Sequence, residues 1–418
     1  MVQHQIFKRA AFTLNKLFKT DIEYLMKGTF HLSIGQMAAG FSGFVLTIGL
    51  VRIFDQAEYG LYSYIFSIVG IIAAFTLSGM DTVVAQSVAK GADGALIQGF
   101  WLKLKWSIPV GVLSLFIGVY YLYQGNIILG ASIFGAGIFI PIIYACSLYG
   151  AYFNGKKQFK KIALDNTMKN SLTTGGVLLV AVLTKDVIFV ILAYFVLNTI
   201  ISLLRFIHLA KKIAGGPTVE KESILFGKHL SAMDALSTIS TQIDKLLVFQ
   251  LLGATPLAVY TLALAPVKQL QGVSKIIRSL ILPKFSNRSL KEIKEGLTYK
   301  LIIIFLFSIG LTAIYWVAIG PIFMKLFPEY EDAIIYTQIL SLSLLSMPFV
   351  LHIQAFTTLH KKTELYIINI IKPVIKIILL LILVPTFGIW GAIVSFLCAI
   401  VVTAIFEMFF FMRIKVTD

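Results

Sequence analysis

The sequence predicts an all-α polytopic membrane protein with about twelve transmembrane helices. Of its 418 residues, 58% are hydrophobic and only 13% are charged, whereas a soluble domain carries about 25% charged residues. Apolar runs of about 20 residues, long enough to cross about 30 Å of hydrocarbon, recur along the whole chain. These runs are too long and too evenly apolar to be strands of a membrane barrel.

The spans follow one another with short connections. They are expected at roughly 30–53, 59–80, 101–124, 127–153, 163–184, 187–208, 225–252, 257–282, 299–319, 333–357, 364–384 and 388–412. Residues 1–27 do not have the form of a signal peptide, because their apolar residues are scattered among basic ones. A cytoplasmic amphipathic helix and a disordered basic tail both fit this segment.

Lysine and arginine predict the orientation in the membrane. Among the 36 Lys and Arg residues, most fall in the N-terminal tail and in every second loop. The alternate loops hold only Arg52, Lys185 and Lys325. Because basic loops stay in the cytoplasm, both termini are expected there. The net charge of +16 then reflects topology, and no nucleic-acid partner is expected.

Five lysines are predicted to lie inside spans, where charge is costly. They are Lys169, Lys245, Lys268, Lys372 and Lys376. Facing lipid, they would together cost on the order of 12–18 kcal/mol. They are therefore expected to face one another, a carboxylate, or water in a cavity.

Charged polar stripes run along three spans of the second half. Span seven carries Ser231, Asp234, Thr238, Thr241 and Lys245 at helical spacing, with Asp244 beside Lys245. Span eight carries Lys268, and span eleven carries Tyr366, Lys372 and Lys376. In the first half, Asp81 lies on striped span two and Lys169 on span five. Small polar residues often serve only helix packing, but stripes with full charges favour a water-filled pathway.

The two halves of the chain resemble each other weakly. Phe54–Val69 aligns with Leu252–Val267, which places Tyr62 on Tyr260. We predict a parallel repeat of two six-helix lobes, residues 28–213 and 224–418, joined by a cytoplasmic linker at 214–223. Chance similarity between apolar helices is the alternative.

Enzyme and cofactor motifs are not found. Gly150–Lys157 nearly matches a phosphate-binding loop, but it lacks the final Ser or Thr and follows a membrane helix. The six histidines show no metal-ligand spacing, and Cys146 and Cys398 are expected to be packing residues. No cofactor or metal is expected, so transport would use ion gradients or substrate supply.

Three segments carry a family resemblance: Arg52–Gly91, Ser237–Leu270 and the turn Pro283–Ser286. Through them the chain resembles the lipid-linked oligosaccharide flippases, the polysaccharide biosynthesis proteins that move O-antigen or capsule repeat units. These belong to the multidrug/oligosaccharidyl-lipid/polysaccharide (MOP) exporter superfamily. The resemblance implies two six-helix lobes around a central cavity.

The resemblance also implies a function in the bacterial cytoplasmic (inner) membrane. The substrate would be an undecaprenyl-pyrophosphate-linked oligosaccharide, moved to the outer leaflet by alternating access for O-antigen, lipopolysaccharide or capsule assembly. A polysaccharide polymerase and a chain-length regulator would be partners, and H⁺ or Na⁺ could couple the cycle.

Each candidate residue then has an expected role. The diphosphate would be bound by Lys245, Lys268, Lys372, Lys376 and Lys169. Asp234, Asp244 and Asp81 are the coupling candidates, and Tyr62, Tyr260 and Tyr366 the sugar-contact candidates. Two other functions stay open: a drug/cation antiporter of the same superfamily, and an integral-membrane enzyme acting on lipid-linked sugars. An antiporter would favour carboxylates in its cavity, and an enzyme would need large outer loops.

Overall fold

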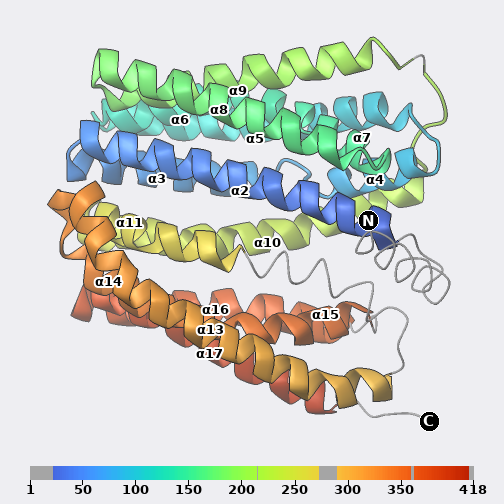
Figure 1. Ribbon diagram of the computed structural model, residues 1–418. Helices are drawn as coiled ribbons and strands as arrows, with labels where there is room; N and C mark the ends of the chain where they lie inside the picture. The colour runs from blue at the N-terminus through green and yellow to red at the C-terminus, as the bar shows by residue number, and fades with distance from the viewer. Residues whose placement is uncertain (1–21, 214, 273–289, 359–361, 414–418) are drawn as a thin grey trace, which may run out of the picture.

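The computed structural model describes residues 22–213, 215–272, 290–358 and 362–413. Most of the predicted amphipathic segment 1–27, and the Pro283–Ser286 turn, lie outside these residues. The described helices run side by side along one direction (Figure 1). They are α2 Ile22–Ile53, α3 Gln56–Ala73, α4 Met80–Ala89, α5 Ala95–Tyr123, α6 Ile127–Cys146, α7 Leu148–Gly155, α8 Phe159–Thr184, α9 Val187–Ala210, α10 Lys221–Leu252, α11 Ala254–Gln271, α13 Leu290–Leu326, α14 Ala333–Leu340, α15 Val350–Thr358, α16 Lys362–Phe387 and α17 Ile389–Arg413.

All twelve predicted spans coincide with helices, but three of them are interrupted. Span two ends in an irregular connection between α3 and α4, in which buried Leu77 has a φ of 60°, and α4 lies almost wholly beyond the predicted end of the span. Span four breaks between α6 and α7 at Ser147. Span ten passes from α14 to α15 through a 3₁₀ segment, Ser341–Phe349. Interrupted helices are tolerated in membranes where neighbouring protein can satisfy the freed backbone groups.

Eight helical stretches among the described residues are long and apolar enough to cross a membrane. The other four predicted spans fall on α3, α8, α10 and α11, which lie alongside these eight in the bundle (Figure 1). These four helices are less apolar because they carry the polar stripes. The helices with the weakest membrane signal are therefore those that carry most of the candidate functional residues.

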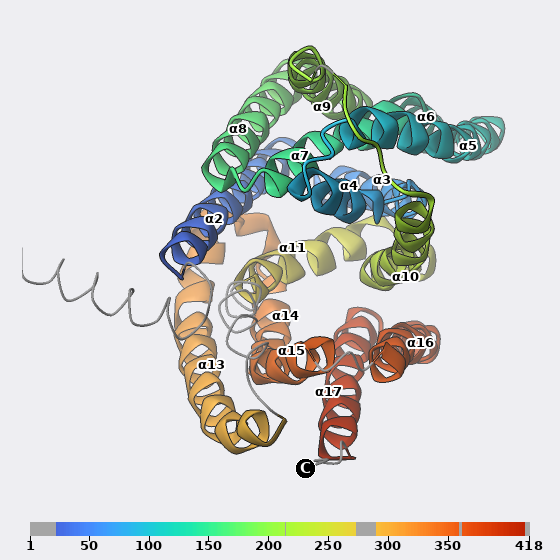
Figure 2. The same ribbon diagram turned by 90° about the vertical axis from the view of Figure 1, so that its right-hand side faces the viewer.

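Helices α10 and α11 join the two halves of the chain. Figure 2 shows α2–α9 on one side and α13–α17 on the other, with α10 and α11 between them. Helix α3 packs on both α10 and α11, and α10 also packs on α16. A Cβ atom on Gly60 would lie 2.0 Å from the carbonyl oxygen of Ala254. Only glycine permits this approach of α3 to α11.

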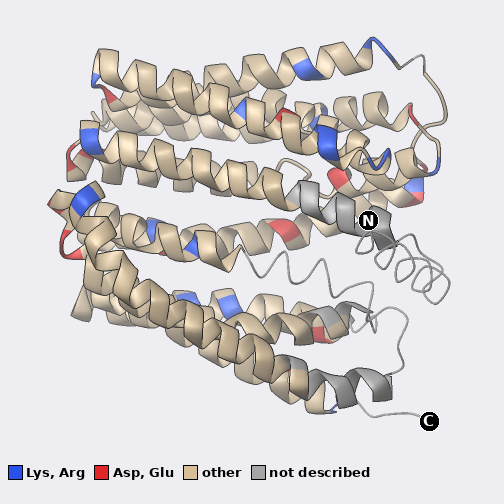
Figure 3. Cartoon of the chain, in the orientation of Figure 1, with Lys and Arg blue, Asp and Glu red and all other residues tan. Residues whose placement is uncertain are grey.

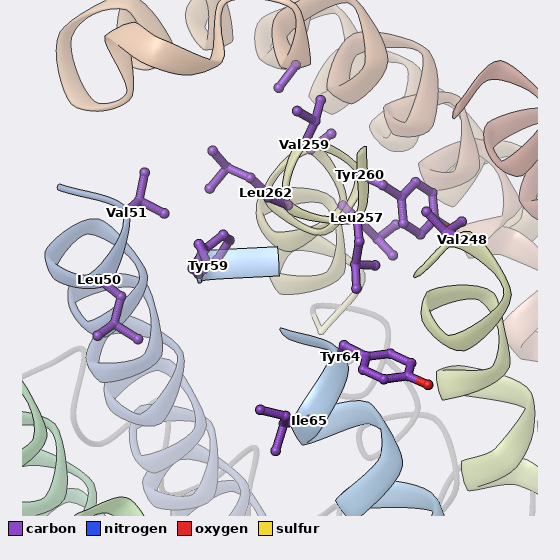
Figure 4. Close-up of a cluster of buried hydrophobic side chains, with 14 of the residues drawn as sticks. Leu50, Val51, Tyr59, Tyr64, Ile65, Val248, Leu257, Val259, Tyr260 and Leu262 are labelled. Carbon is purple, nitrogen blue, oxygen red and sulfur yellow. The ribbon is translucent and has the colours of Figure 1, made fainter. Parts of the chain in front are cut away.

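The largest apolar cluster surrounds this junction. Figure 4 shows Leu50 and Val51 of α2, Tyr59 and Ile65 of α3, and Leu257 and Leu262 of α11 converging there. All six side chains are 5% exposed or less. Tyr64 of α3 stacks on Phe249 of α10 with ring centroids 3.7 Å apart and also hydrogen-bonds to Gln250. The contact between halves is thus a packed core.

The start of α2 and the end of α17 lie at the same end of the bundle (Figure 1), which is where the predicted topology puts the basic loops. Figure 3 shows where the described charged residues lie along the helices. Lys103, at the start of predicted span three, lies within α5 and is 1% exposed. In the turn after α7, Lys156 lies 2.7 Å from Asp93, and this hydrogen-bonded carboxylate raises the pKa of the Lys156 ammonium.

Candidate functional site

The large cavity has a volume of about 1060 Å³ and lies between α2, α10, α11 and α13. Its α10 and α11 walls are polar: Thr241, Gln242, Lys245, Lys268, Gln269 and Gln271. Its α2 and α13 walls are mostly apolar: Met37, Phe41 and Phe44 on α2, and Ile319, Ile322, Phe323 and Phe327 on α13. The cavity is therefore amphipathic, with two lysines on the polar side.

The small cavity has a volume of about 360 Å³ and lies among α10, α11, α15, α16 and α17. Its charged lining residues are Lys268, Lys372, Lys376 and Glu407. Lys268, Thr241 and Gln271 border both cavities, so the two spaces adjoin along α10 and α11. Four of the five lysines predicted to lie inside spans thus come together around these two cavities.

Asp244 and Lys245 are neighbours in sequence but face different surroundings. Asp244 is fully buried, and its Oδ2 lies 2.9 Å from Nζ of Lys376 on α16. Tyr260 donates a hydrogen bond of 3.0 Å to the same oxygen, and Lys376 also donates to the carbonyl of Ser240 at 2.9 Å. Lys245, one residue on, points about 100° away around the helix and lines the large cavity.

The ion pair changes the interpretation of three predicted residues. Asp244 was a coupling candidate, but it is held in an ion pair with Lys376. Lys376 was expected to bind substrate, yet it is 4% exposed and joins α16 to α10. Tyr260 was expected to touch sugar, but it is fully buried and bonded to Asp244. A sugar-contact role for Tyr260 does not fit this position.

Lys245, Lys268 and Lys372 keep their ammonium groups available. No ion pair or hydrogen bond from the Nζ of any of the three is found among the residues that the structure describes. Lys268 and Lys372 are exposed and Lys245 is half-buried, although all three lie on helices deep in the bundle. These are the groups that an anion in the cavities could reach.

The remaining candidates lie away from both cavities. Lys169 on α8 donates to Ser202 on α9 at 2.9 Å. Tyr62 packs between Tyr59 and Phe66, and Tyr366 hydrogen-bonds to His229 on α10. None of these three predicted residues lines the large or the small cavity.

The two remaining carboxylates lie near the break between α3 and α4. Asp81 forms an ion pair with Lys103, with 2.7 Å between Oδ1 and Nζ, and accepts a hydrogen bond from Ser147. Asp234 on α10 is exposed and accepts a 2.9 Å hydrogen bond from Ser78, which belongs to the first half of the chain. Asp234 therefore sits at a contact between the two halves.

Sequence reasoning missed Lys103 and gave no role to Glu407. Lys103 was missed because it follows only two turns after a basic loop, where a snorkelling lysine is common. Glu407 is 4% exposed and lines the small cavity. As the one acidic residue in span twelve, it could have been paired with the lysines of span eleven. No group of three or more potential metal ligands occurs within the described ranges.

The halves also touch at the end opposite the basic loops. Arg52 of α2 donates to the carbonyls of Lys325 and Leu326 at 3.3 and 3.4 Å, and Gln56 donates to that of Glu329 at 2.5 Å. Phe44 meets Phe327 edge to face, with centroids 6.4 Å apart. These contacts join α2 and the start of α3 to the end of α13, beside Phe44 and Phe327 of the large cavity.

The fold matches solved structures of MOP-superfamily transporters over nearly the whole chain. An outward-facing multidrug resistance MATE family transporter gives a TM-score of 0.68 at 16% identity, covering 93% of this chain and 94% of the other. A MOP superfamily transporter from Pyrococcus furiosus, described as having a binding pocket of reverse polarity, gives 0.66 at 16%, with the same coverage. An inward-facing MATE transporter gives 0.62 at 15%, covering 91% and 94%.

By fold, then, the chain resembles the transporters of the MOP superfamily. The family model described as polysaccharide biosynthesis protein matches residues 25–289, which is more than half of the sequence. The chain belongs to the polysaccharide biosynthesis protein family. No curated protein matches it.

Proposed function

We propose that the protein is a flippase for a lipid-linked oligosaccharide whose carrier is a polyprenyl diphosphate. The observation that carries this proposal is the position of Lys245 and Lys268 on the polar wall of the large cavity, with no side-chain partner among the described residues. An ammonium is a good point-charge partner for a phosphate. Family membership supports a substrate used in polysaccharide assembly.

The amphipathic cavity suits such a substrate. The diphosphate would lie near Lys245 and Lys268, and the sugars near the amides of Gln242 and Gln269. The lipid chain would extend along Met37 and Phe41 of α2, both 69% exposed, toward the bilayer. A polar head and an apolar chain are then accommodated on opposite walls.

A drug/cation antiporter is the alternative that shares this fold. A cationic substrate would need a carboxylate in the cavity that is free to pair with it. None of the described residues that line the large cavity is acidic. Asp244, the nearest carboxylate on α10, already pairs with Lys376. Repulsion from Lys245 and Lys268 would oppose a cation, which favours the flippase.

Transport in reconstituted vesicles tests the proposal. A fluorescent polyprenyl-diphosphate oligosaccharide placed in the inner leaflet should become accessible outside only with active protein. Lys245→Ala should reduce this movement strongly, and Lys245→Arg should retain part of it, because charge matters more than shape. Lys169→Ala, which removes a lysine outside both cavities, is the matched control. Normal movement with Lys245→Ala and Lys268→Ala, or movement of cationic dyes instead, would refute the proposal.

Asp234 is the carboxylate that this proposal assigns to proton coupling. Asp244 and Asp81 are both held in ion pairs, whereas Asp234 only accepts from Ser78 across the two halves. Protonation would remove the charge that this contact depends on. Asp234→Asn should make vesicle transport insensitive to pH, while Ser78→Ala, which keeps the carboxyl group, should preserve the pH response. An unchanged pH response in Asp234→Asn would exclude the role.

The proposal includes location and organisation. The protein would lie in a bacterial inner membrane with both termini in the cytoplasm, and would work beside a polysaccharide polymerase and a chain-length regulator. The lobes would be residues 28–213 and 224–418, although α10 begins at Lys221, inside the proposed linker. Cysteine labelling should find Pro217 inside and Gln124 outside. Labelling of Pro217 from the outside would break the six-plus-six scheme.

A further inference from the structure

The small cavity is lined by helices of the second half of the chain and adjoins the large one. Its volume of about 360 Å³ is about a third of that of the large cavity. One water takes about 30 Å³ in the liquid, so the space is large enough for a small hydrated ion.

The charges on its wall do not cancel. Lys376 is neutralised by Asp244, at 2.9 Å. Lys268 and Lys372 remain, against the single carboxylate of Glu407, so the wall carries net positive charge. An excess ammonium deep inside a membrane bundle is stable only with water or an anion beside it. The cavity therefore favours an anion over a cation.

Two of the neutral lining residues, Asn369 and Ser237, can also donate to an anion. Thr241 and Thr403 use their hydroxyl hydrogens on backbone carbonyls of their own helices, at 2.8 and 2.6 Å. Asn369 stands one turn before Lys372 on the same face of α16 and lines the cavity. Ser237 lines it from α10. Two ammonium groups, an amide and a hydroxyl from three helices thus surround the space.

We propose that the small cavity is a binding site for a small inorganic anion, such as chloride or phosphate, held between Lys268 and Lys372. Because Lys268 also borders the large cavity, this anion and the substrate diphosphate compete for one ammonium. The anion occupies the empty carrier and leaves when the diphosphate engages Lys268. This exchange rests on the proposed flippase function, whereas the anion site itself does not.

Thermal unfolding of the purified full-length protein in detergent tests the site. Unfolding in sodium chloride or sodium phosphate is compared with unfolding in sodium gluconate at the same ionic strength. Either small anion should stabilise the wild type in a saturable way. Lys372→Gln, which alters only the small cavity, should weaken the apparent affinity by roughly ten- to hundredfold, as for one lost charge-assisted hydrogen bond. Lys245→Gln, which alters only the large cavity, should retain the wild-type affinity.

The outcomes separate the anion site from the flippase function. Saturable stabilisation that Lys372→Gln loses and Lys245→Gln keeps supports the site, even if no lipid-linked sugar is moved. No saturable effect of either anion, or an equal effect in wild type and Lys372→Gln, overturns it. The exchange is tested by adding a soluble polyprenyl-diphosphate analogue, which should lower the apparent anion affinity. Unchanged anion affinity at saturating analogue overturns the exchange and leaves the site standing.

Discussion

Removing the charge of Lys376 should destabilise the protein far more than removing that of Lys245. Lys376 contributes the ammonium of a pair whose side chains are 5% and 0% exposed, with 2.9 Å between Nζ and Oδ2 of Asp244. Lys376→Met leaves a fully buried carboxylate with Tyr260 as its remaining side-chain donor. Breaking a buried pair in this way costs about 3–5 kcal/mol. Lys245→Met breaks no such pair.

The double variant distinguishes the contribution of the ion pair to stability from the cost of leaving one buried charge without its partner. Asp244→Asn with Lys376→Met removes both charges, and an amide at 244 can still accept from Tyr260. Replacing both members of a buried pair by neutral groups is often near neutral. The double variant should therefore recover most of the stability that Lys376→Met loses, and this non-additivity measures the coupling between α10 and α16.

The assay is the midpoint of thermal unfolding in detergent, followed by size-exclusion of a fluorescent fusion. For a unit of about 200 residues, a loss of about 3–5 kcal/mol lowers the midpoint by about 6–20 °C. Lys245→Met should stay within a few degrees of the wild type. If Lys376→Met unfolds at the wild-type temperature, or if the double variant equals the sum of the singles, the ion pair does not hold these helices together.

Two further outcomes follow from the contacts of the first half. Asp81→Asn should lower the unfolding midpoint more than Lys103→Met, because the first leaves a lysine that is 1% exposed without its charge partner, and the second leaves a carboxylate that is 44% exposed to water. Equal midpoints would contradict this. Gly60→Ala should cost about 1–3 kcal/mol, seen as a lower midpoint, because its Cβ would meet the carbonyl of Ala254 at 2.0 Å. Gly43→Ala on α2 is the control, because its added Cβ would meet nothing within 4 Å. An unfolding midpoint for Gly60→Ala as high as that for Gly43→Ala would contradict the close approach of α3 to α11.

The helices themselves could be predicted because their signal is local. Apolar length decides whether a segment spans a membrane, and each predicted span coincides with a helix or with an interrupted one. The interruptions were not predicted. Leu77 adopts a positive φ inside span two, although leucine has no local preference for it. That conformation depends on the packing of α3 and α4 against α10, which the sequence of one segment does not reveal.

The site could be predicted only in part, because pairing is a tertiary property. Helical spacing correctly brought Lys245, Lys268 and Lys372 toward shared cavities, since a stripe of charge must avoid lipid. Spacing cannot say which helix faces which stripe. Asp244 forms its ion pair with Lys376, more than 130 residues further along the chain, although Lys245 is adjacent in sequence. The positions of Tyr62 and Tyr260 in packed surroundings could not be predicted for the same reason, since a tyrosine suits a packed core and a binding wall equally well.

The different surroundings of the adjacent residues Asp244 and Lys245 affect the whole transport cycle. Because Asp244 is committed to Lys376, the charge of Lys245, Lys268 and Lys372 is left to be offset by other means. Three lysines facing lipid would cost about 8–10 kcal/mol, which is comparable with the stability of a domain. The empty carrier can avoid this cost only by keeping its cavities filled with water or anions. After the diphosphate is released, water or anions must enter the cavities. The lysines that attract the substrate therefore also require that water or anions replace it.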